Sequence, residues 1–420
     1  MNSTGDRREL DVSPCFKIKS IHGRKVLNSH AEWTNEFDVV LANGARGTAS
    51  APRGETLSIH EKPLASTSDV EKAIGLVWSE NRFAGDLSQE AFDRALDTHR
   101  YALGLGNMYA LSLAFFAATT IALGVDARTM LARFRDRRLS GPTRSPRLLL
   151  NILNGGSHAY TNPVLSDFSE FLLVPRDGAL EEHLAAFQAL NSRVRAELSR
   201  LPVCRVGGNP VHRQRANSNR GWIEFLLEIL EREGLARQFG LMIDASAGCL
   251  KSDGQYCLST TGDGSLKPDV FYEYWVNLLS NYPIDIVEDP FAEFDTQAWK
   301  ALTAEFPDRL VAGDNLCATN ADRISGSFDN GLMSAVLIKP DQAGTVTATV
   351  HALNTAGSLG LSMIPSHRSI ETSSTFLSDI CGVYCIEYAK LGLLSDFETI
   401  LKLNRLIRNF DRADDQNHNG

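Results

Sequence analysis

The sequence predicts an α/β protein in which an α+β domain over residues 1–140 precedes a barrel of strands and helices over residues 141–420. Three observations support this division: strands followed by helices in the first part, a polar linker, and alternating strands and helices in the remainder. The length of 420 residues suits two or three domains, and 43% hydrophobic with 22% charged residues is the balance of a globular chain.

The first domain is predicted to combine an antiparallel sheet with a block of helices. Short strands and turns are expected between residues 16 and 51, because residues 35–41 alternate between polar and apolar side chains. From about Ser66 to Phe134 the apolar positions recur at spacings of three and four, as in helices, and residues 110–123 are nearly all apolar. Strands followed by a block of helices indicate an α+β domain.

The second domain begins after a linker at residues 135–147, which are basic and rich in Pro, Gly and Ser. Beyond it, short apolar runs alternate with helical stretches, as buried parallel strands do. The runs are residues 148–153, 171–174, 240–243, 284–287, 309–312, 335–338, 361–364 and 384–388. Roughly 270 residues of such alternation fit a barrel of about 250 residues with insertions.

Composition and charge exclude several classes of protein. The formal charge is −9 and the pI about 5.6, so the chain lacks the basic surface that binds nucleic acid or anionic membranes. The N-terminus has no apolar segment of signal-peptide length, and the best apolar run, Tyr109 to Gly124, is too short to span a bilayer. Seven cysteines without a CxxC pair suit reduced thiols. We therefore expect a cytoplasmic protein with no nucleic-acid or membrane partner.

Polar residues follow six of the apolar runs. They are Asp244, Glu288, Asp314, Lys339, His367 and Lys390. Because parallel strands of a barrel run the same way, residues at their carboxyl ends meet at one mouth, where such barrels keep their sites. A single acid at a strand end is as often a salt-bridged surface residue as a ligand. Six such residues in register predict one cleft with three carboxylates, two lysines and a histidine.

These residue types predict proton abstraction assisted by a metal ion. Carboxylates are hard oxygen ligands that suit Mg²⁺, which keeps coordination positions open for water and substrate. A lysine near clustered cations can have its pKa lowered enough to act as a base. A second lysine can balance the negative charge of a substrate carboxylate or phosphate.

Five sequence strings around these positions carry a resemblance to a known family. They are Asn151-Ile-Leu-Asn-Gly-Gly-Ser-His-Ala, Tyr282-Pro-Ile-Asp-Ile-Val-Glu-Asp-Pro, Gly313-Asp-Asn-Leu-Cys-Ala-Thr-Asn, Leu337-Ile-Lys-Pro-Asp-Gln-Ala-Gly-Thr and Ser366-His-Arg-Ser-Ile-Glu-Thr. Each resembles a segment of the enolase family, and the similarity extends from about residue 16 to residue 409. The resemblance implies an enolase-type (β/α)8 barrel with an N-terminal α+β capping domain, Mg²⁺ as cofactor, and a homodimer or higher homo-oligomer.

The resemblance also implies roles for individual residues. Asp244, Glu288 and Asp314 would hold Mg²⁺, and Lys339 would be the base that removes the proton beside the substrate carboxylate. The other residues would surround the substrate: Lys390 beside the enolate charge, Arg368 and Ser369 on the phosphate, His367 next to them, and His158 and Glu170 on the opposite wall.

The sequence departs from the family at two places in the cleft. Val206-Gly-Gly-Asn-Pro-Val places Asn209 where the family carries the glutamic acid that protonates the leaving hydroxyl, and an amide has no proton to give at a useful pKa. In the lid string Pro52-Arg-Gly-Glu-Thr-Leu-Ser, Thr56 replaces a serine that binds a second Mg²⁺ in the family. Thr56 and Arg53 are expected to contact the substrate, and Arg53 offers a bidentate partner for an extra carboxylate or phosphonate group. The base and the principal metal ligands are therefore kept, while the acid and the lid are changed.

Three interpretations remain open. The first is a lyase that performs α-proton abstraction and β-elimination on a phosphonate or phosphinate analogue, similar to the carboxyphosphonoenolpyruvate synthases of phosphonate antibiotic biosynthesis. The second is an ordinary phosphopyruvate hydratase that converts 2-phosphoglycerate to phosphoenolpyruvate. The third is a non-catalytic relative with a binding or structural role, which the joint presence of Lys339, Lys390 and the three acids disfavours. In the first two cases the partner is a small phosphorylated or phosphonate carboxylate.

Overall fold

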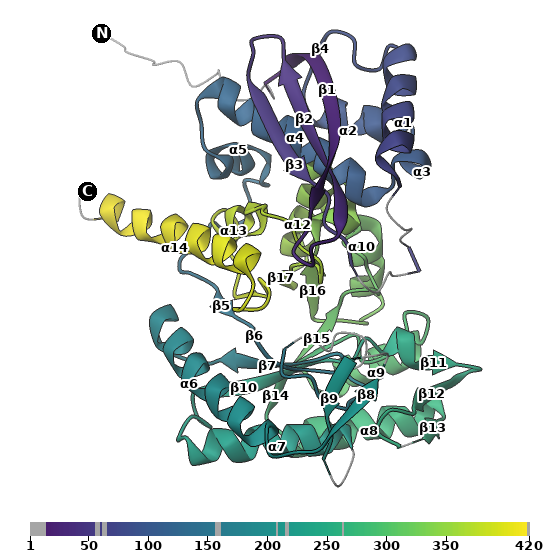
Figure 1. The fold of residues 1–420 in the computed structure, drawn as a ribbon, viewed down its shortest axis with the longest axis vertical. Helices are drawn as coiled ribbons and strands as arrows, with labels where there is room; N and C mark the ends of the chain where they lie inside the picture. Colours follow the sequence, from purple (N-terminus) through teal and green to yellow (C-terminus); the bar gives the residue numbers. More distant parts are fainter. Residues whose placement is uncertain are drawn as a thin grey trace.

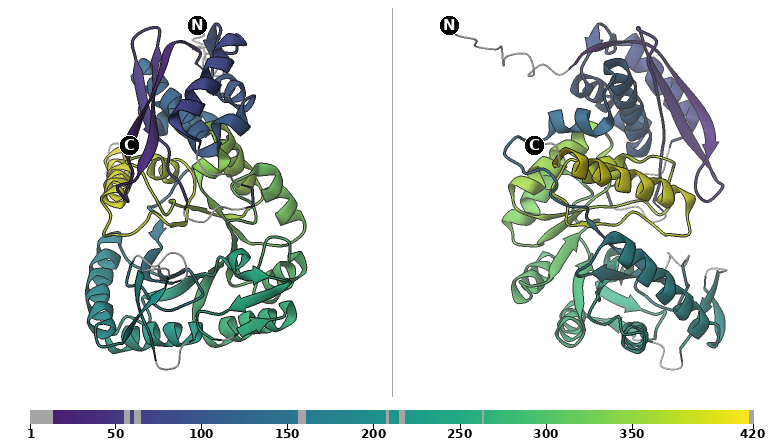
Figure 2. Two further views of the ribbon diagram at one scale, coloured as in Figure 1. Left: turned by 45° about the vertical axis from the view of Figure 1, so that its right-hand side comes forward. Right: turned by 90° about the vertical axis from the view of Figure 1, so that its left-hand side faces the viewer.

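The chain folds into two parts, which Figure 1 shows stacked along the long axis of the molecule. In the computed structural model, the described residues are 14–54, 59–60, 65–155, 161–206, 209–214, 218–262 and 264–417. The predicted order, an α+β domain followed by a barrel, is confirmed. Figure 2 shows that the C-terminal helix α14 lies beside the junction of the two parts.

The N-terminal part is an antiparallel sheet covered by helices on one side. Its strands are β1 (Phe16–Leu27), β2 (Trp33–Leu41), β3 (Arg46–Ser50) and β4 (Asp86–Leu87), in the order β3-β2-β1-β4. Its helices are α1 (Thr67–Ser79), α2 (Gln89–Asp97), α3 (Arg100–Leu103), α4 (Leu105–Leu123) and α5 (Ala127–Phe134). The alternation over residues 35–41 places Phe37, Val39 and Leu41 in the core, as the strand period requires.

Helix α4 is the central core element of this domain, packed against β2 and β3. The helix is long and apolar enough to cross a membrane, but 72% of its most apolar 18-residue stretch is buried inside the fold, as in a core helix. Strand β3 approaches α4 at Gly47, where a Cβ atom would lie 2.0 Å from the carbonyl oxygen of Ala114 and 2.3 Å from the nitrogen of Ala118. Only glycine fits there, because no side-chain movement could relieve a clash with backbone atoms.

The barrel is formed by a seven-stranded sheet in the order β17-β16-β15-β14-β10-β7-β6 and by the pair β18-β5. The strands are β5 (Arg147–Leu148), β6 (Leu150–Asn154), β7 (Glu170–Pro175), β10 (Phe239–Asp244), β14 (Ile284–Glu288), β15 (Leu310–Gly313), β16 (Ala335–Ile338), β17 (Ser362–Pro365) and β18 (Tyr388–Ala389). A bridge between Ser366 and Lys390 joins the ends of β17 and β18. Alternate apolar residues of these strands, including Leu172, Met242 and Ile286, form a separate interior cluster.

Helices cover the outside of the barrel. They are α6 (Leu180–Leu198), α7 (Asn219–Arg232), α8 (Pro268–Asn281), α9 (Thr296–Glu305), α10 (Ala321–Asp329), α11 (Pro340–Ala343), α12 (Val346–Ser358), α13 (Phe376–Cys381) and α14 (Phe397–Asn417). Small hairpins interrupt the alternation: β8 (Val203–Val206) with β9 (Asn209–His212), and β11 (Lys251–Ser252), β12 (Gln255–Leu258) and β13 (Gly264–Leu266) after the short helix η1 (Ala247–Leu250).

Two details of the predicted barrel are wrong. Strand β7 runs antiparallel to both neighbours, β6 and β10, so the strands do not all point the same way. The run 384–388 forms a strand only at its end, since β18 comprises Tyr388 and Ala389. The reversal of β7 matters for the site, because it places the first residue of β7, Glu170, beside the last residue of β10, Asp244.

Candidate active site

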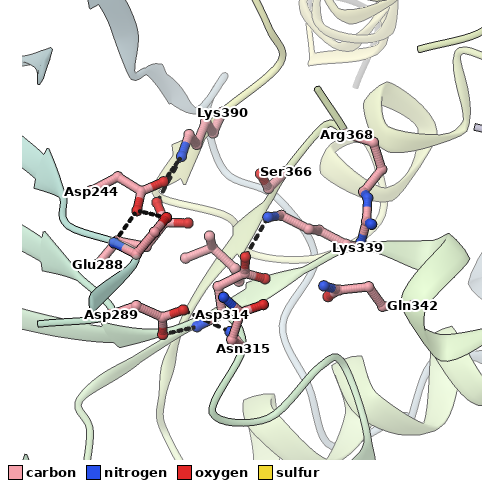
Figure 3. A network of polar contacts seen from close by, with 12 residues as sticks. Asp244, Glu288, Asp289, Asp314, Asn315, Lys339, Gln342, Ser366, Arg368 and Lys390 are labelled. Carbon is pink, nitrogen blue, oxygen red and sulfur yellow. Dashed lines mark hydrogen bonds and ion pairs between the residues drawn. The ribbon is translucent and has the colours of Figure 1, made fainter. Parts of the chain in front are cut away.

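Residues from separate strands meet at one mouth of the barrel (Figure 3). Asp244 and Glu288 are the last residues of β10 and β14, and they are directly paired in the parallel register of those strands. Asp314, Lys339 and Lys390 each follow the last residue of a strand, β15, β16 and β18. The predicted convergence at the strand ends is therefore present in the fold.

Lys390 lies at the centre of an acidic group. Its Nζ is 2.5 Å from Glu170 Oε2, 2.7 Å from Glu288 Oε2 and 3.1 Å from Asp244 Oδ2. Burial alone would lower the pKa of Lys390, but the negative charges of Glu170, Glu288 and Asp244 raise it well above its ordinary value. Lys390 is therefore a fixed positive charge in the cleft.

Lys339 forms a second ion pair, with its Nζ 2.5 Å from Asp314 Oδ2. Its backbone N–H donates to Thr319 Oγ1 at 2.8 Å, which fixes the start of the segment after β16. The expectation that clustered metal cations lower its pKa stays a prediction, and the protein groups alone act as follows. Burial lowers the pKa of Lys339, but the carboxylates of Asp314 and Glu288 outweigh burial and raise it.

Two buried carboxylate oxygens in this cleft have no hydrogen-bond partner among the described residues, Glu288 Oε1 and Asp314 Oδ1. Burial, and then the negative charge of Asp244, raise the pKa of Glu288 well above its usual range. Such oxygens are suitable ligands for Mg²⁺, which prefers hard oxygen donors. Within the described chain no three His, Cys, Asp or Glu side chains are grouped closely enough to hold a metal ion, so binding one would draw these carboxylates together.

Asp289 supports the strand-end carboxylates, a role that the sequence did not predict. Its carboxylate accepts the backbone N–H groups of Asp314 and Asn315, each at 2.9 Å, and it is buried. Its own backbone is left-handed, with φ at 44°, which is costly for a residue with a side chain. The signal was its place directly after Glu288 in the string Glu-Asp-Pro.

The loop after β17 carries the predicted phosphate-binding residues. Burial lowers the pKa of His367 to about 4, so its imidazole is neutral at pH 7. Arg368 is buried, with its Nε 3.3 Å from Asp341 Oδ2, and its backbone N–H donates to Glu371 Oε1 at 2.8 Å. Ser369 is half-buried next to it.

The N-terminal domain is joined to this loop by backbone hydrogen bonds. Arg53 and Ile370 exchange N–H···O bonds of 3.0 and 3.1 Å, which place the start of the lid against the segment after Arg368. The guanidinium of Arg53 is bound to Glu32 near the surface. The positive charge that the sequence assigned to an additional substrate group therefore already has a carboxylate partner.

Other predicted residues are only partly described. His158 and Thr56 lie outside the described residues. Asn209 begins β9 and pairs with Val206 of β8, and its side chain lies outside the described part of the chain. His212, at the end of β9, has a buried Nδ1 with no hydrogen-bond partner among the described residues. The hairpin that bears Asn209 is thus placed in the fold.

The comparison with protein families decides the classification. Residues 144–419 match the family model described as "Enolase, C-terminal TIM barrel domain". The chain belongs to the enolase family. It is 30% identical over 419 residues to the enolase of Ehrlichia ruminantium (strain Welgevonden), covering 93% of this chain and 95% of the relative. It is 31% identical over 415 residues to the enolase of Natranaerobius thermophilus, covering 93% of this chain and 94% of the relative.

Membership of the enolase family confirms the predicted enolase-type barrel with its N-terminal α+β domain. It also identifies the chain as a lyase of the enolase type, and enolase-family sites generally use Mg²⁺. The matched length includes the strand-end acids and lysines, so these residues lie in the part of the chain that the family shares.

Proposed function

We propose that this enolase-family lyase removes the proton beside the carboxylate of a 2-phosphoglycerate-type acid and expels hydroxide from the neighbouring carbon, the reaction of a phosphopyruvate hydratase. The observation that carries the proposal is the convergence of Lys339, Lys390 and the strand-end carboxylates in one buried cleft. The relatives named "Enolase" match over nearly the whole chain and favour this substrate over a phosphonate.

In this proposal Asp244, Glu288 and Asp314 hold Mg²⁺, and the orphaned oxygens of Glu288 and Asp314 fit that role. A bound Mg²⁺ supplies positive charge that lowers the cost of the negative charge developing on the substrate carboxylate.

The two lysines have different tasks. Lys339 can accept the proton only when its amine is neutral, so its ion pair with Asp314 has to open before it acts as a base. Lys390 stays protonated among Glu170, Asp244 and Glu288 and offsets the charge of the enolate that forms. Arg368 and Ser369 supply donors for the phosphate on the side of the cleft that faces the N-terminal domain.

A second candidate function is supported by Asn209. Because an amide cannot protonate a leaving hydroxide, this position favours a lyase for a phosphonate or phosphinate analogue, as in carboxyphosphonoenolpyruvate synthases. The ion pair of Arg53 with Glu32 weakens the case that Arg53 recognises an additional anionic group. His212, three residues after Asn209 in the sequence, or Glu170 could supply a proton instead.

The test is an assay of phosphoenolpyruvate absorbance with saturating Mg²⁺, comparing wild type with Asn209→Glu. Turnover of 2-phosphoglycerate within about tenfold of a glycolytic enolase supports the hydratase, since losing a general acid costs about 10²–10⁴ in rate. A lower rate that Asn209→Glu restores supports the second candidate. The matched control, Asn209→Gln, keeps an amide and should change neither result.

The remaining expectations stay predictions. We propose a cytoplasmic homodimer or higher homo-oligomer whose partner is a small phosphorylated or phosphonate carboxylate. Neither nucleic acid nor a membrane is expected to bind, because the chain carries a net charge of −9.

A further inference from the structure

A hollow of about 380 Å³ lies at the seam between the N-terminal domain and the barrel, and the ion-paired residues of the cleft are not among its described lining residues. The N-terminal domain contributes His60 and the region of α3, which includes Arg100. The barrel contributes the first turn of α10, with Arg323, and part of α12, with His351. Figure 1 shows α3 and α10 on the same side of the molecule. The volume is within the range of small-molecule sites.

The hollow is basic although the whole chain is acidic. Two guanidinium groups and two imidazoles line it, and Asp322 is the one carboxylate among its described lining residues. The chain as a whole has a formal charge of −9. Arg100 is bound to Asp97 on the surface, with Nε 3.0 Å from Asp97 Oδ1. An excess of positive side chains around one concave space attracts anions.

Arg323 is held in place by neutral groups. Its Nε donates to the carbonyl of Cys317 at 2.7 Å, and its Nη2 donates to the carbonyl of Ala318 at 3.3 Å. The turn that presents these carbonyls is left-handed at Ala318 and Thr319, with φ of 40° and 48°. Burial, together with the positive charge of Arg100, lowers the pKa of Arg323. The guanidinium is thus fixed by two backbone carbonyls at the wall of the hollow, and the positive charge of Arg100 acts on it.

We propose that this hollow binds a small anion that carries a phosphoryl group, at a site distinct from the catalytic cleft. Arginine suits this role because its planar guanidinium donates two parallel hydrogen bonds to phosphate oxygens. Arg100 and Arg323 approach from the two domains, so a bound anion would neutralise both and connect the domains across their seam. This inference does not depend on which substrate the cleft takes.

The hollow also touches the segment that holds the candidate base. Thr319 and Gln342 line it, and Thr319 Oγ1 accepts the backbone N–H of Lys339 at 2.8 Å. Thr319 Oγ1 also lies 3.4 Å from Gln342 Oε1, and Figure 3 shows Gln342 beside Lys339 and Arg368. An anion in the hollow would therefore lie against Thr319, which holds the backbone of Lys339.

The test is calorimetric titration of the full-length protein with inorganic phosphate. Arg100→Gln should weaken binding at one site by about tenfold or more, the value of a lost charge-assisted hydrogen bond. Arg100 is exposed, so this variant should keep the fold, and Arg323→Gln should show the same loss. The control Arg94→Gln removes an exposed arginine of α2 outside the hollow and should bind as wild type. Wild-type phosphate affinity in both Arg100→Gln and Arg323→Gln, or an equal loss in Arg94→Gln, would overturn the proposal.

Discussion

The strand ends and the lid side of the active-site mouth are held by different kinds of structure. Asp244 and Glu288 lie within paired strands, so their positions follow from the register of the barrel. Arg53 and Asn209 lie in a lid segment and a small hairpin, where backbone contacts are fewer. The difference teaches that residues at the ends of paired strands are tied to the fold, while residues in the lid segment and the hairpin can change without disturbing the barrel.

The strongest test of the strand-end group is Lys339→Ala. If Lys339 is the base, the variant should lose exchange of the substrate's α-proton with deuterated water by about 10⁴-fold or more, the upper range for general base catalysis. Exchange is followed by NMR in the presence of Mg²⁺. Lys72→Ala, which removes an exposed lysine of α1, is the control. Exchange that persists in Lys339→Ala would assign the base to another residue.

The metal donors give the next largest effect. Glu288→Gln removes a charge from the candidate Mg²⁺ site and should weaken Mg²⁺ binding by at least about 100-fold. This exceeds the usual effect of replacing a residue that only contacts a metal ligand, which is about 10- to 100-fold. Calorimetry with MgCl₂ measures the affinity, and Mg²⁺ should raise the melting temperature of wild type but not of the variant. Glu90→Gln, an exposed acid on α2, should bind Mg²⁺ as wild type does. Equal affinity in Glu288→Gln would remove this residue from the site.

A smaller effect is expected from His367, whose pKa burial lowers to about 4. In the unfolded chain the imidazole of His367 takes up a proton near its ordinary pKa of 6.5, whereas in the folded chain it stays neutral down to a pH of about 4. The free energy of unfolding therefore falls as the pH drops from about 6.5 to about 4. The loss is about 1–3 kcal/mol. Urea denaturation across this pH range, compared between wild type and His367→Gln, measures it. A pH profile of stability identical in the two proteins would show that His367 is not held neutral.

The smallest effect should come from Arg53→Ala on the lid side. Its surface ion pair with Glu32 contributes about 0–1 kcal/mol, so stability and turnover of 2-phosphoglycerate should change little. Glu32→Ala is the matched variant, because it leaves Arg53 without this partner. Thermal denaturation and KM for each substrate are the measurements. A tenfold rise in KM for a phosphonate analogue in Arg53→Ala alone would show that Arg53 does reach the substrate.

Much of the site was predictable from residue types and spacing. Each of Asp244, Glu288, Asp314 and Lys339 follows a short apolar run, and in a barrel such residues share one mouth. The departure from the family's string at Asn209 was also visible in the sequence. Glu170 is different, because the sequence alone did not show that β7 runs antiparallel and so sets this residue beside Asp244.

The sequence by itself determined the fold class, the strand-end residues and the family, because periodicity and local strings are properties of the chain. Only the tertiary structure decided that Lys339 pairs with Asp314 and that Asp289 supports Asp314. It also decided that Arg100 and Arg323 face one hollow. The physical reason is that pKa values and ion pairs depend on which distant residues are brought within a few ångströms and withdrawn from water, and spacing along the chain does not specify either.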